Sequence, residues 1–115
     1  MEFNKLLKIP SLSDIKKVAH LLTGVFKCTP LEYSVPLSDR YGAQIFLKSE
    51  DLQTVRSYKI RGAYFKISNI PDALRSQGIF AASAGNHAQG VAYACAKLKI
   101  QCNYFHAEID ALTEA

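Results

Sequence analysis

The sequence predicts an α/β protein with a parallel sheet, and three observations support this class. Apolar residues recur with helical spacing over residues 14–26 and 57–70. Short apolar runs at 43–48, 79–82 and 100–105 are typical of strands. Finally, a strand, a tight turn, a helix and a second strand follow one another over residues 79–105, and so compact a βαβ unit requires parallel strands.

The first helix is expected over residues 14–26, with Ser13 as its N-cap and Asp14 in its first turn. Its apolar positions follow the spacing i, i+3, i+4 and i+7. They are Ile15, Val18, Ala19, Leu22, Val25 and Phe26. Because the residue before a proline avoids the helical region, Thr29-Pro30 predicts an extended segment after this helix.

The middle of the chain predicts a short helical turn, a strand and a second helix. The turn is expected over residues 37–40 and ends at Gly42, and the strand follows over 43–48. Residues 49–51 interrupt the strand pattern. The second helix is expected over 57–70, with Ser57 as its cap and Pro71 marking its end.

The last third contains the βαβ unit. A strand over 79–82, a turn over 83–86, a helix over 87–99 and a strand over 100–105 are expected. The inner face of this helix carries Val91, Ala94, Cys95 and Leu98. Three strands fall short of the about five of a doubly wound sheet, so we expect the opening part of a larger α/β protein.

Composition excludes several classes of function. The chain is 49% hydrophobic and 21% charged, as globular proteins are, and its net charge of +4 comes from scattered residues rather than from a nucleic-acid-binding stripe. It contains no apolar run long enough for a membrane helix and no apolar stretch at its start typical of a secretory signal, so we expect a cytoplasmic protein. Cys28, Cys95 and Cys102 show no metal-ligand spacing, so reduced thiols and no metal site are expected.

Two segments could carry chemistry, and the first is 57–63. If Ser57 caps the helix, Lys59 and Arg61 lie in the first turn, where the helix dipole disfavours cations. They are either solvated basic residues that pair with Glu50 or Asp51, or a functional pair. In the functional interpretation, the positive field and burial lower the pKa of Lys59, as a Schiff-base lysine requires, while Arg61 holds an anion or braces the loop.

The second segment, 83–90, lies between a strand and a helix, where backbone N–H groups and the helix dipole bind anions. Gly85 permits a close approach, and Ser83 and Asn86 can add hydrogen bonds to a carboxylate or a phosphate. The alternative is a plain strand-to-helix turn with Asn86 as its cap. The segment is neither G-x-G-x-x-G nor G-x-S-x-G, so dinucleotide binding and a hydrolase elbow are not indicated.

Three motifs in order and spacing resemble the threonine dehydratase family, which belongs to the pyridoxal-phosphate enzymes of the tryptophan-synthase-β fold. They are Lys48-Ser49-Glu50-Asp51-Leu52-Gln53, Ser57-Tyr58-Lys59-Ile60-Arg61-Gly62-Ala63 and Ala82-Ser83-Ala84-Gly85-Asn86-His87-Ala88-Gln89-Gly90. Thr29-Pro30-Leu31 is similar to the family's N-terminal segment. The resemblance runs from about residue 13 to 100 and implies an incomplete three-layer αβα parallel-sheet fold of type II.

The resemblance also implies a cofactor and roles for individual residues. Lys59 corresponds to the lysine that binds pyridoxal 5′-phosphate as a Schiff base and later shuttles protons, and Tyr58 stands where an aromatic ring lies against the cofactor. Asn86 corresponds to the residue that hydrogen-bonds the 3′-oxygen of the cofactor. Ser83, Asn86 and His87 correspond to the loop that binds the substrate carboxylate.

The implied reaction is a lyase reaction on a small amino acid. L-threonine would give 2-oxobutanoate and ammonia, the first committed step toward isoleucine, and L-serine would give pyruvate. Serine racemases resemble this family but carry a serine where this chain has Ala84, which favours elimination over racemisation. The alternative is a catalytically inactive truncated remnant, or an anion-binding α/β module that depends on a partner.

The resemblance also divides the chain. Residues 1–70 would be the N-terminal part of the large cofactor-binding domain, and residues 71–115 the first, truncated βαβ portion of the small domain. The sequence after Ile100 departs from the family pattern, and the Gly-rich loop that cradles the cofactor phosphate has no counterpart. Because 49% of the residues are hydrophobic, we expect the folded chain to associate or to form a homo-oligomer.

Overall fold

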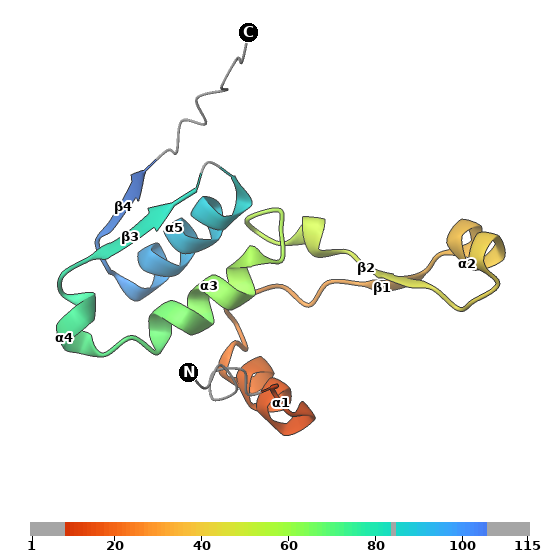
Figure 1. Ribbon diagram of the computed structural model, residues 1–115, viewed down its shortest axis with the longest axis horizontal. Coiled ribbons are helices and arrows are strands. Elements are labelled where there is room, and N and C mark those ends of the chain that lie inside the picture. Colours follow the sequence, from red (N-terminus) through yellow and green to blue (C-terminus); the bar gives the residue numbers. More distant parts are fainter. Residues whose placement is uncertain (1–8, 84, 106–115) are drawn as a thin grey trace, which may run out of the picture.

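The computed structural model describes residues 9–83 and 85–105, and Figure 1 shows how their elements are arranged. The expectations for Ala84 and for the sequence after Phe105 lie outside these residues. The elements in chain order are α1 (Leu12–Leu21), β1 (Leu31–Tyr33), α2 (Val35–Tyr41), β2 (Phe46–Lys48), a 3-10 turn (Glu50–Leu52), α3 (Lys59–Ser68), α4 (Asp72–Arg75), β3 (Ile79–Ala82), α5 (Asn86–Leu98) and β4 (Cys102–Phe105).

The predicted βαβ unit is confirmed. Strands β3 and β4 pair in parallel, with Ile79 opposite Cys102 and Ala82 opposite Phe105, and α5 makes the crossover between them. The backbone N–H of Ile79 also donates to the carbonyl of Gln101 at 2.9 Å, and this bond lies where both strands begin. In Figure 1 the strands lie side by side, with α5 along one face.

The core lies between α3, α5 and β3. The predicted inner face of α5 is confirmed: three of its four residues are buried, and Leu98 packs against them partly buried. The buried members of this cluster are Ala63, Ile67, Ala81, Val91, Ala94 and Cys95. Helix α3 therefore shares a core with the βαβ unit across residue 70, and the proposed domain division there remains a prediction.

An arm of β1, α2 and β2 projects away from this core (Figure 1). The two strands pair antiparallel, with Leu31 opposite Lys48 and Tyr33 opposite Phe46, and the rings of the latter pair meet edge to face at 5.3 Å. The segment after Pro30 is extended, as predicted, but its pairing as a strand was not predicted. Six large apolar side chains of the arm are 48–64% exposed: Leu31, Tyr33, Val35, Tyr41, Phe46 and Leu47.

Helix α2 ends at Gly42, as predicted, although it begins earlier than expected. Gly42 has a φ of +60°, a left-handed conformation that glycine adopts without strain. The sequence pattern located this end because the glycine is required there. The start is less marked, since Ser34 makes no side-chain cap hydrogen bond and Pro36 lies in the first turn.

The prediction of Ser13 as the N-cap of the first helix is wrong. Ser11 is the cap: its hydroxyl accepts from the Asp14 N–H at 3.1 Å, and the Asp14 carboxylate accepts from the Ser11 N–H at 2.9 Å. This reciprocal pair needs an acidic residue three positions after the cap, which Ser11 has and Ser13 lacks. The helix ends at Leu21 rather than at Phe26, and turns follow over residues 22–25, with Gly24 at φ +79°.

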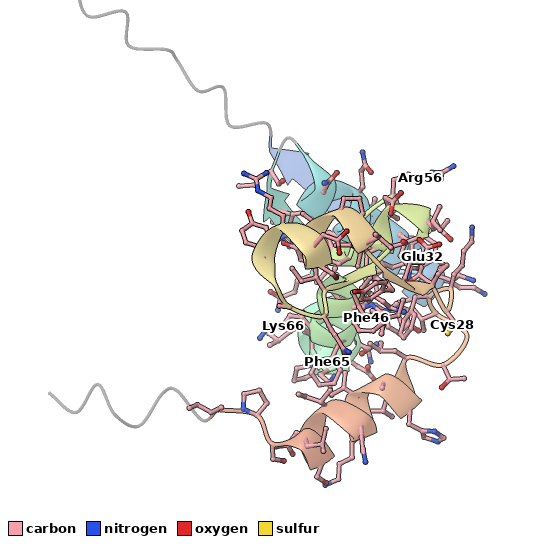
Figure 2. All side chains as sticks on the ribbon, turned by 90° about the vertical axis from the view of Figure 1, so that its right-hand side faces the viewer. Cys28, Glu32, Phe46, Arg56, Phe65 and Lys66 are labelled. Carbon is pink, nitrogen blue, oxygen red and sulfur yellow. The ribbon has the colours of Figure 1, made fainter. Side chains whose placement is uncertain are left out.

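Helix α1 packs only loosely on the rest of the protein. A groove of about 440 Å³ separates it from α3, and Phe65, labelled in Figure 2, lines it together with Ile15, Val18 and Leu22. None of the residues of α1 is buried. The apolar stripe predicted for this helix therefore faces α3 but is not fully covered by it.

Candidate functional site

The predicted lysine is the first residue of α3. Lys59 is half-buried, and its Nζ lies 5.0 Å from the ring centroid of Tyr58, whose side chain is 61% exposed. The expected cap at Ser57 is wrong, because Tyr58 takes the N-cap position without a side-chain hydrogen bond. Ser57 is buried, and its Oγ has no hydrogen-bond partner among the residues that the structure describes.

Gly90 brings helix α5 against this lysine. A Cβ added at Gly90 would lie 3.0 Å from the carbonyl carbon and oxygen of Lys59 and 3.1 Å from its Cβ. Asn86 lies one turn before Gly90, so these two residues share a face of α5. The contact therefore places Asn86 and Lys59 at the same end of the helix pair.

His87 faces a different space. It lines a cleft of about 370 Å³ with Val91 of the same helix, residues of α3 and the strand β3. Its side chain is exposed, as is that of Asn86. Ser83 directly follows β3, and its Oγ accepts from the Gly85 N–H at 3.3 Å. The structure thus gathers Ser83, Asn86 and His87 at the N-terminus of α5, with His87 at a cleft between α3 and β3.

Arg61 braces the loop that leads into α3. Its Nε and its terminal nitrogen donate to the two carboxylate oxygens of Glu50, each at 2.8 Å. Its guanidinium also lies 3.8 Å from the ring centroid of Phe26. The pairing with Glu50 was one of the interpretations left open by the sequence, and the structure selects it over anion binding by Arg61.

Sequence reasoning missed a second brace, formed by Gln53. This side chain is fully buried, accepts from the Lys27 N–H at 2.9 Å and donates to the Lys27 carbonyl at 2.8 Å. Thr29 donates to Glu50 at 2.7 Å. Glu50 and Gln53 stand in the first motif of the family resemblance, which was the available signal. A pairing with Glu50 was among the interpretations left open, but neither spacing nor residue type indicated Lys27 as the partner of Gln53.

The braces also determine the charge state of Glu50. Hydrogen bonds from Arg61 lower the pKa of Glu50 to about 2, with smaller contributions from Thr29 and Gln53, while burial opposes the shift. The same contact raises the pKa of Arg61. Glu50 is therefore a carboxylate throughout the physiological range and is not suited to act as a general acid.

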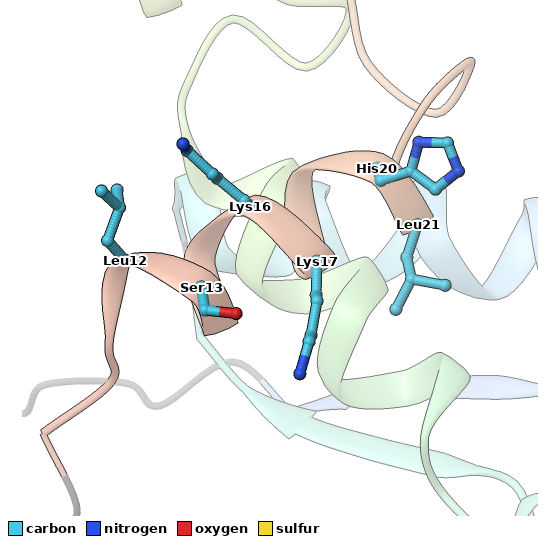
Figure 3. A pocket seen from close by; sticks show the side chains of 6 residues that line it. All are labelled: Leu12, Ser13, Lys16, Lys17, His20 and Leu21. Atoms are coloured by element: carbon cyan, nitrogen blue, oxygen red, sulfur yellow. The ribbon is translucent and has the colours of Figure 1, made fainter.

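Other features of the structure carry no predicted site residue. A hollow of about 840 Å³ lies over the outer face of α1 and is lined by Leu12, Ser13, Lys16, Lys17, His20 and Leu21 (Figure 3). Within residues 9–83 and 85–105, no group of three His, Cys, Asp or Glu side chains could hold a metal ion. In the same part of the chain, no helix is long and apolar enough to cross a membrane.

Comparison with known proteins identifies the family. The model of the family described as "Pyridoxal-phosphate dependent enzyme" matches residues 22–111 of the 115. The chain belongs to this family. Pyridoxal phosphate is thus the cofactor of its family, and the resemblance predicted from the three motifs is confirmed.

Within the pyridoxal-phosphate dependent enzymes, the chain matches the N-terminal part of biosynthetic threonine dehydratases. It is 48% identical to that of Lactococcus lactis over 95 residues (83% of this chain, 23% of the relative) and 52% identical to that of Corynebacterium glutamicum over 89 residues (77% and 20%). The chain therefore spans about a fifth to a quarter of the length of these relatives.

Solved structures of this enzyme family have the same fold. The chain matches the processed form of threonine deaminase isoform 2 of Solanum lycopersicum with a TM-score of 0.65 and 37% identity, over 83% of this chain and 28% of that one. It matches serine racemase of Dictyostelium discoideum with a TM-score of 0.71 and 29% identity, over 80% and 30%. The predicted fold of type II pyridoxal-phosphate enzymes is confirmed.

The residues present fit part of a pyridoxal-phosphate site. Lys59 has the amine that can bind the aldehyde of the cofactor, and the neighbouring Tyr58 has a ring that can lie against the cofactor ring. Asn86 adds an amide that can form a hydrogen bond to the cofactor. The close contact at Gly90 shows that the first turns of α5 pack directly against the backbone of Lys59.

Proposed function

We propose that this chain provides the lysine and the carboxylate-binding loop of a threonine dehydratase-type lyase. The observation that carries this proposal is the contact between Gly90 and Lys59, which brings the N-termini of α3 and α5 together. One terminus presents a primary amine, and the other presents backbone N–H groups with positive dipole character. An amino acid bound through its carboxylate at α5 would have its α-carbon near that amine.

In this proposal each predicted residue has one task. Lys59 holds the cofactor covalently through Nζ and afterwards carries the proton taken from the substrate, while the Tyr58 ring supports the cofactor ring. Asn86 hydrogen-bonds the ring oxygen of the cofactor, and it binds the substrate carboxylate together with Ser83 and His87. When bound, pyridoxal phosphate supplies the electron sink for loss of the α-proton.

The substrate and the setting of the reaction are part of the same proposal. L-threonine would be converted to 2-oxobutanoate and ammonia, and L-serine to pyruvate, in the cytoplasm. Residues 1–70 would belong to a large cofactor-binding domain and residues 71–115 to a small domain. The exposed apolar arm of β1, α2 and β2 supports association with a second copy or another chain.

A different function is favoured by the openness of the site. Tyr58 is 61% exposed and Asn86 is exposed, so this chain by itself does not enclose a ligand in the way that small-molecule sites usually do. The alternative proposal is an anion-binding α/β module without covalent chemistry. It predicts binding of a small carboxylate at the N-terminus of α5 but no covalent product at Lys59.

Reductive trapping distinguishes these functions. The purified chain is mixed with pyridoxal phosphate and reduced with borohydride, and the modified lysines are mapped by mass spectrometry. We expect modification concentrated on Lys59 and lost in Lys59→Ala, with Lys66→Ala as the matched control, because Lys66 is exposed in the last turn of the same helix. Modification spread evenly over exposed lysines would reject the lyase proposal.

Activity is measured separately, with L-threonine and L-serine as substrates and the 2-oxo acid as the product. Formation of 2-oxobutanoate that is lost in Lys59→Ala would establish a dehydratase. Trapping at Lys59 without any 2-oxo acid would show that the chain binds the cofactor but does not complete the reaction.

A further inference from the structure

We propose that Glu50 is a positioning residue for Lys59, and that it acts through Arg61. This inference deepens the proposed function and rests on it. Glu50 contacts neither Lys59 nor any group proposed to touch the substrate; its carboxylate is occupied by Arg61, Thr29 and Gln53.

The first step of the argument is the place of Arg61. It lies two residues after Lys59 in the first turn of α3, and both of its bonds to Glu50 are 2.8 Å long. A guanidinium held by two parallel hydrogen bonds is fixed in orientation as well as in distance. The carboxylate therefore restrains the turn from which the Lys59 side chain projects.

The second step is that no cap fixes the start of this turn. Helix α3 has no side-chain cap, and Arg56, three residues before Lys59, has a φ of +57°, a conformation rarely adopted by residues other than glycine. Lys59 and Arg61 also place two positive charges at the positive end of the helix dipole. Glu50 supplies a negative charge that offsets the unfavourable interaction of these two charges with the helix dipole.

The third step is that Glu50 itself is held in place. Thr29 donates to it at 2.7 Å, and Gln53 joins the same loop to Lys27 by two hydrogen bonds. The hydroxyl of Tyr93 in α5 donates to the carbonyl of Val25 at 3.1 Å. Hydrogen bonds thus join the segment before β1 to the loop and to α5. Glu50 links this segment to α3 through Arg61.

The experiment compares Glu50→Gln with Asp51→Asn. Both variants remove one negative charge from neighbouring residues, but Asp51 is exposed and Glu50 is the partner of Arg61. After trapping with pyridoxal phosphate and borohydride, the ratio of modification at Lys59 to that at Lys66 is measured within each sample. We expect this ratio to fall about three- to tenfold in Glu50→Gln and to stay unchanged in Asp51→Asn.

The ratio of modification at Lys59 to that at Lys66 separates positioning from stability, because unfolding would change the modification of both lysines. Circular dichroism shows separately whether each variant is folded. If Glu50→Gln does not fold, Thr29→Val removes one hydrogen bond to Glu50 and keeps its charge, and a smaller fall of the ratio is expected. A ratio unchanged in the folded variant would overturn the proposal.

A second readout needs no cofactor and separates this inference from the proposed function. Brief acetylation with acetic anhydride reports how accessible Lys59 is relative to Lys66. Loss of positioning in Glu50→Gln should bring their rates closer together, whether or not the wild-type chain binds pyridoxal phosphate. Trapping that fails in the wild type would reject the proposed function; equal acetylation ratios in the wild type and Glu50→Gln would reject the role of Glu50.

Discussion

A methyl group added at Gly90 tests the packing that joins the two halves of the candidate site. In Gly90→Ala the new Cβ would meet the Lys59 carbonyl carbon and oxygen at 3.0 Å, closer than ordinary contacts. These atoms belong to the backbone of α3, so the helices must separate by a few tenths of an ångström. Overpacking of this kind costs about 1–3 kcal/mol, while replacing glycine by alanine inside a helix contributes about 1 kcal/mol in the opposite direction.

Gly62→Ala supplies the matched control. Gly62 lies in α3, is exposed, and its added Cβ would meet no atom within 4 Å. This variant should therefore gain about 0.4–1 kcal/mol in free energy of unfolding. The free energy of unfolding of Gly90→Ala should fall by up to about 2 kcal/mol. The free energies of the two variants then differ by about 1–3 kcal/mol, which equals the steric cost.

The assay is urea unfolding followed by circular dichroism, with the midpoint and the slope compared for the two variants and the wild type. The ratio of trapped pyridoxal phosphate at Lys59 to that at Lys66 should fall in Gly90→Ala, because the lysine moves, and should not fall in Gly62→Ala. Equal stabilisation by both substitutions would refute the close approach of α5 to Lys59.

Three further predictions follow from the structure. Because the pKa of Glu50 is lowered to about 2 from 4.5, the stability that its pairing with Arg61 provides is fully present above about pH 4.5 and is lost as the pH falls toward 2. Acid titration of the wild type should show this loss of stability, and Glu50→Gln should show a smaller loss. Equal losses in the two proteins would contradict the role of the Glu50 pKa. Burial and the neighbouring Cys102 raise the pKa of Cys95 to about 12, whereas Cys28 is exposed, so a disulfide reagent at pH 8 should label Cys28 much faster. Mass spectrometry of partly labelled chain checks this order, and faster labelling of Cys95 would show that its site is open. Phe46→Asp places a charge on the exposed apolar arm and should reduce self-association in light scattering; an unchanged molecular mass would exclude this arm as the contact.

Local signals predicted the parts of the fold in which one residue type dictates the backbone. The glycine at position 42 marked the end of α2, and the apolar spacing over 87–99 marked the inner face of α5. Where several residues could serve, the pattern was ambiguous. The expected cap of α1, Ser13, was wrong for this reason: Ser11 lies two residues earlier and forms the reciprocal bonds with Asp14.

The antiparallel pairing of β1 with β2 was missed for a different reason. Strand β2 lies within the strand expected over 43–48, but β1 has only three residues, which are too few for alternation to be recognised, and both strands carry exposed side chains. Their register depends on pairing between residues 13 to 17 apart in the sequence, and the 2.9 Å bond from the Ser34 N–H to the Ile45 carbonyl continues this pairing beyond the strands.

For the candidate site, the sequence by itself determined which reactive groups are present. The residue types in three motifs gave the amine of Lys59, the loop with Asn86 and the family to which the chain belongs. Only the tertiary structure decided how these parts are held. The two bonds from Arg61 to Glu50, the buried amide of Gln53 and the contact of Gly90 with Lys59 join positions that are 11, 26 and 31 residues apart. Short-range patterns such as helical periodicity carry no information about which distant groups will meet, because that depends on how α3 and α5 pack on one another.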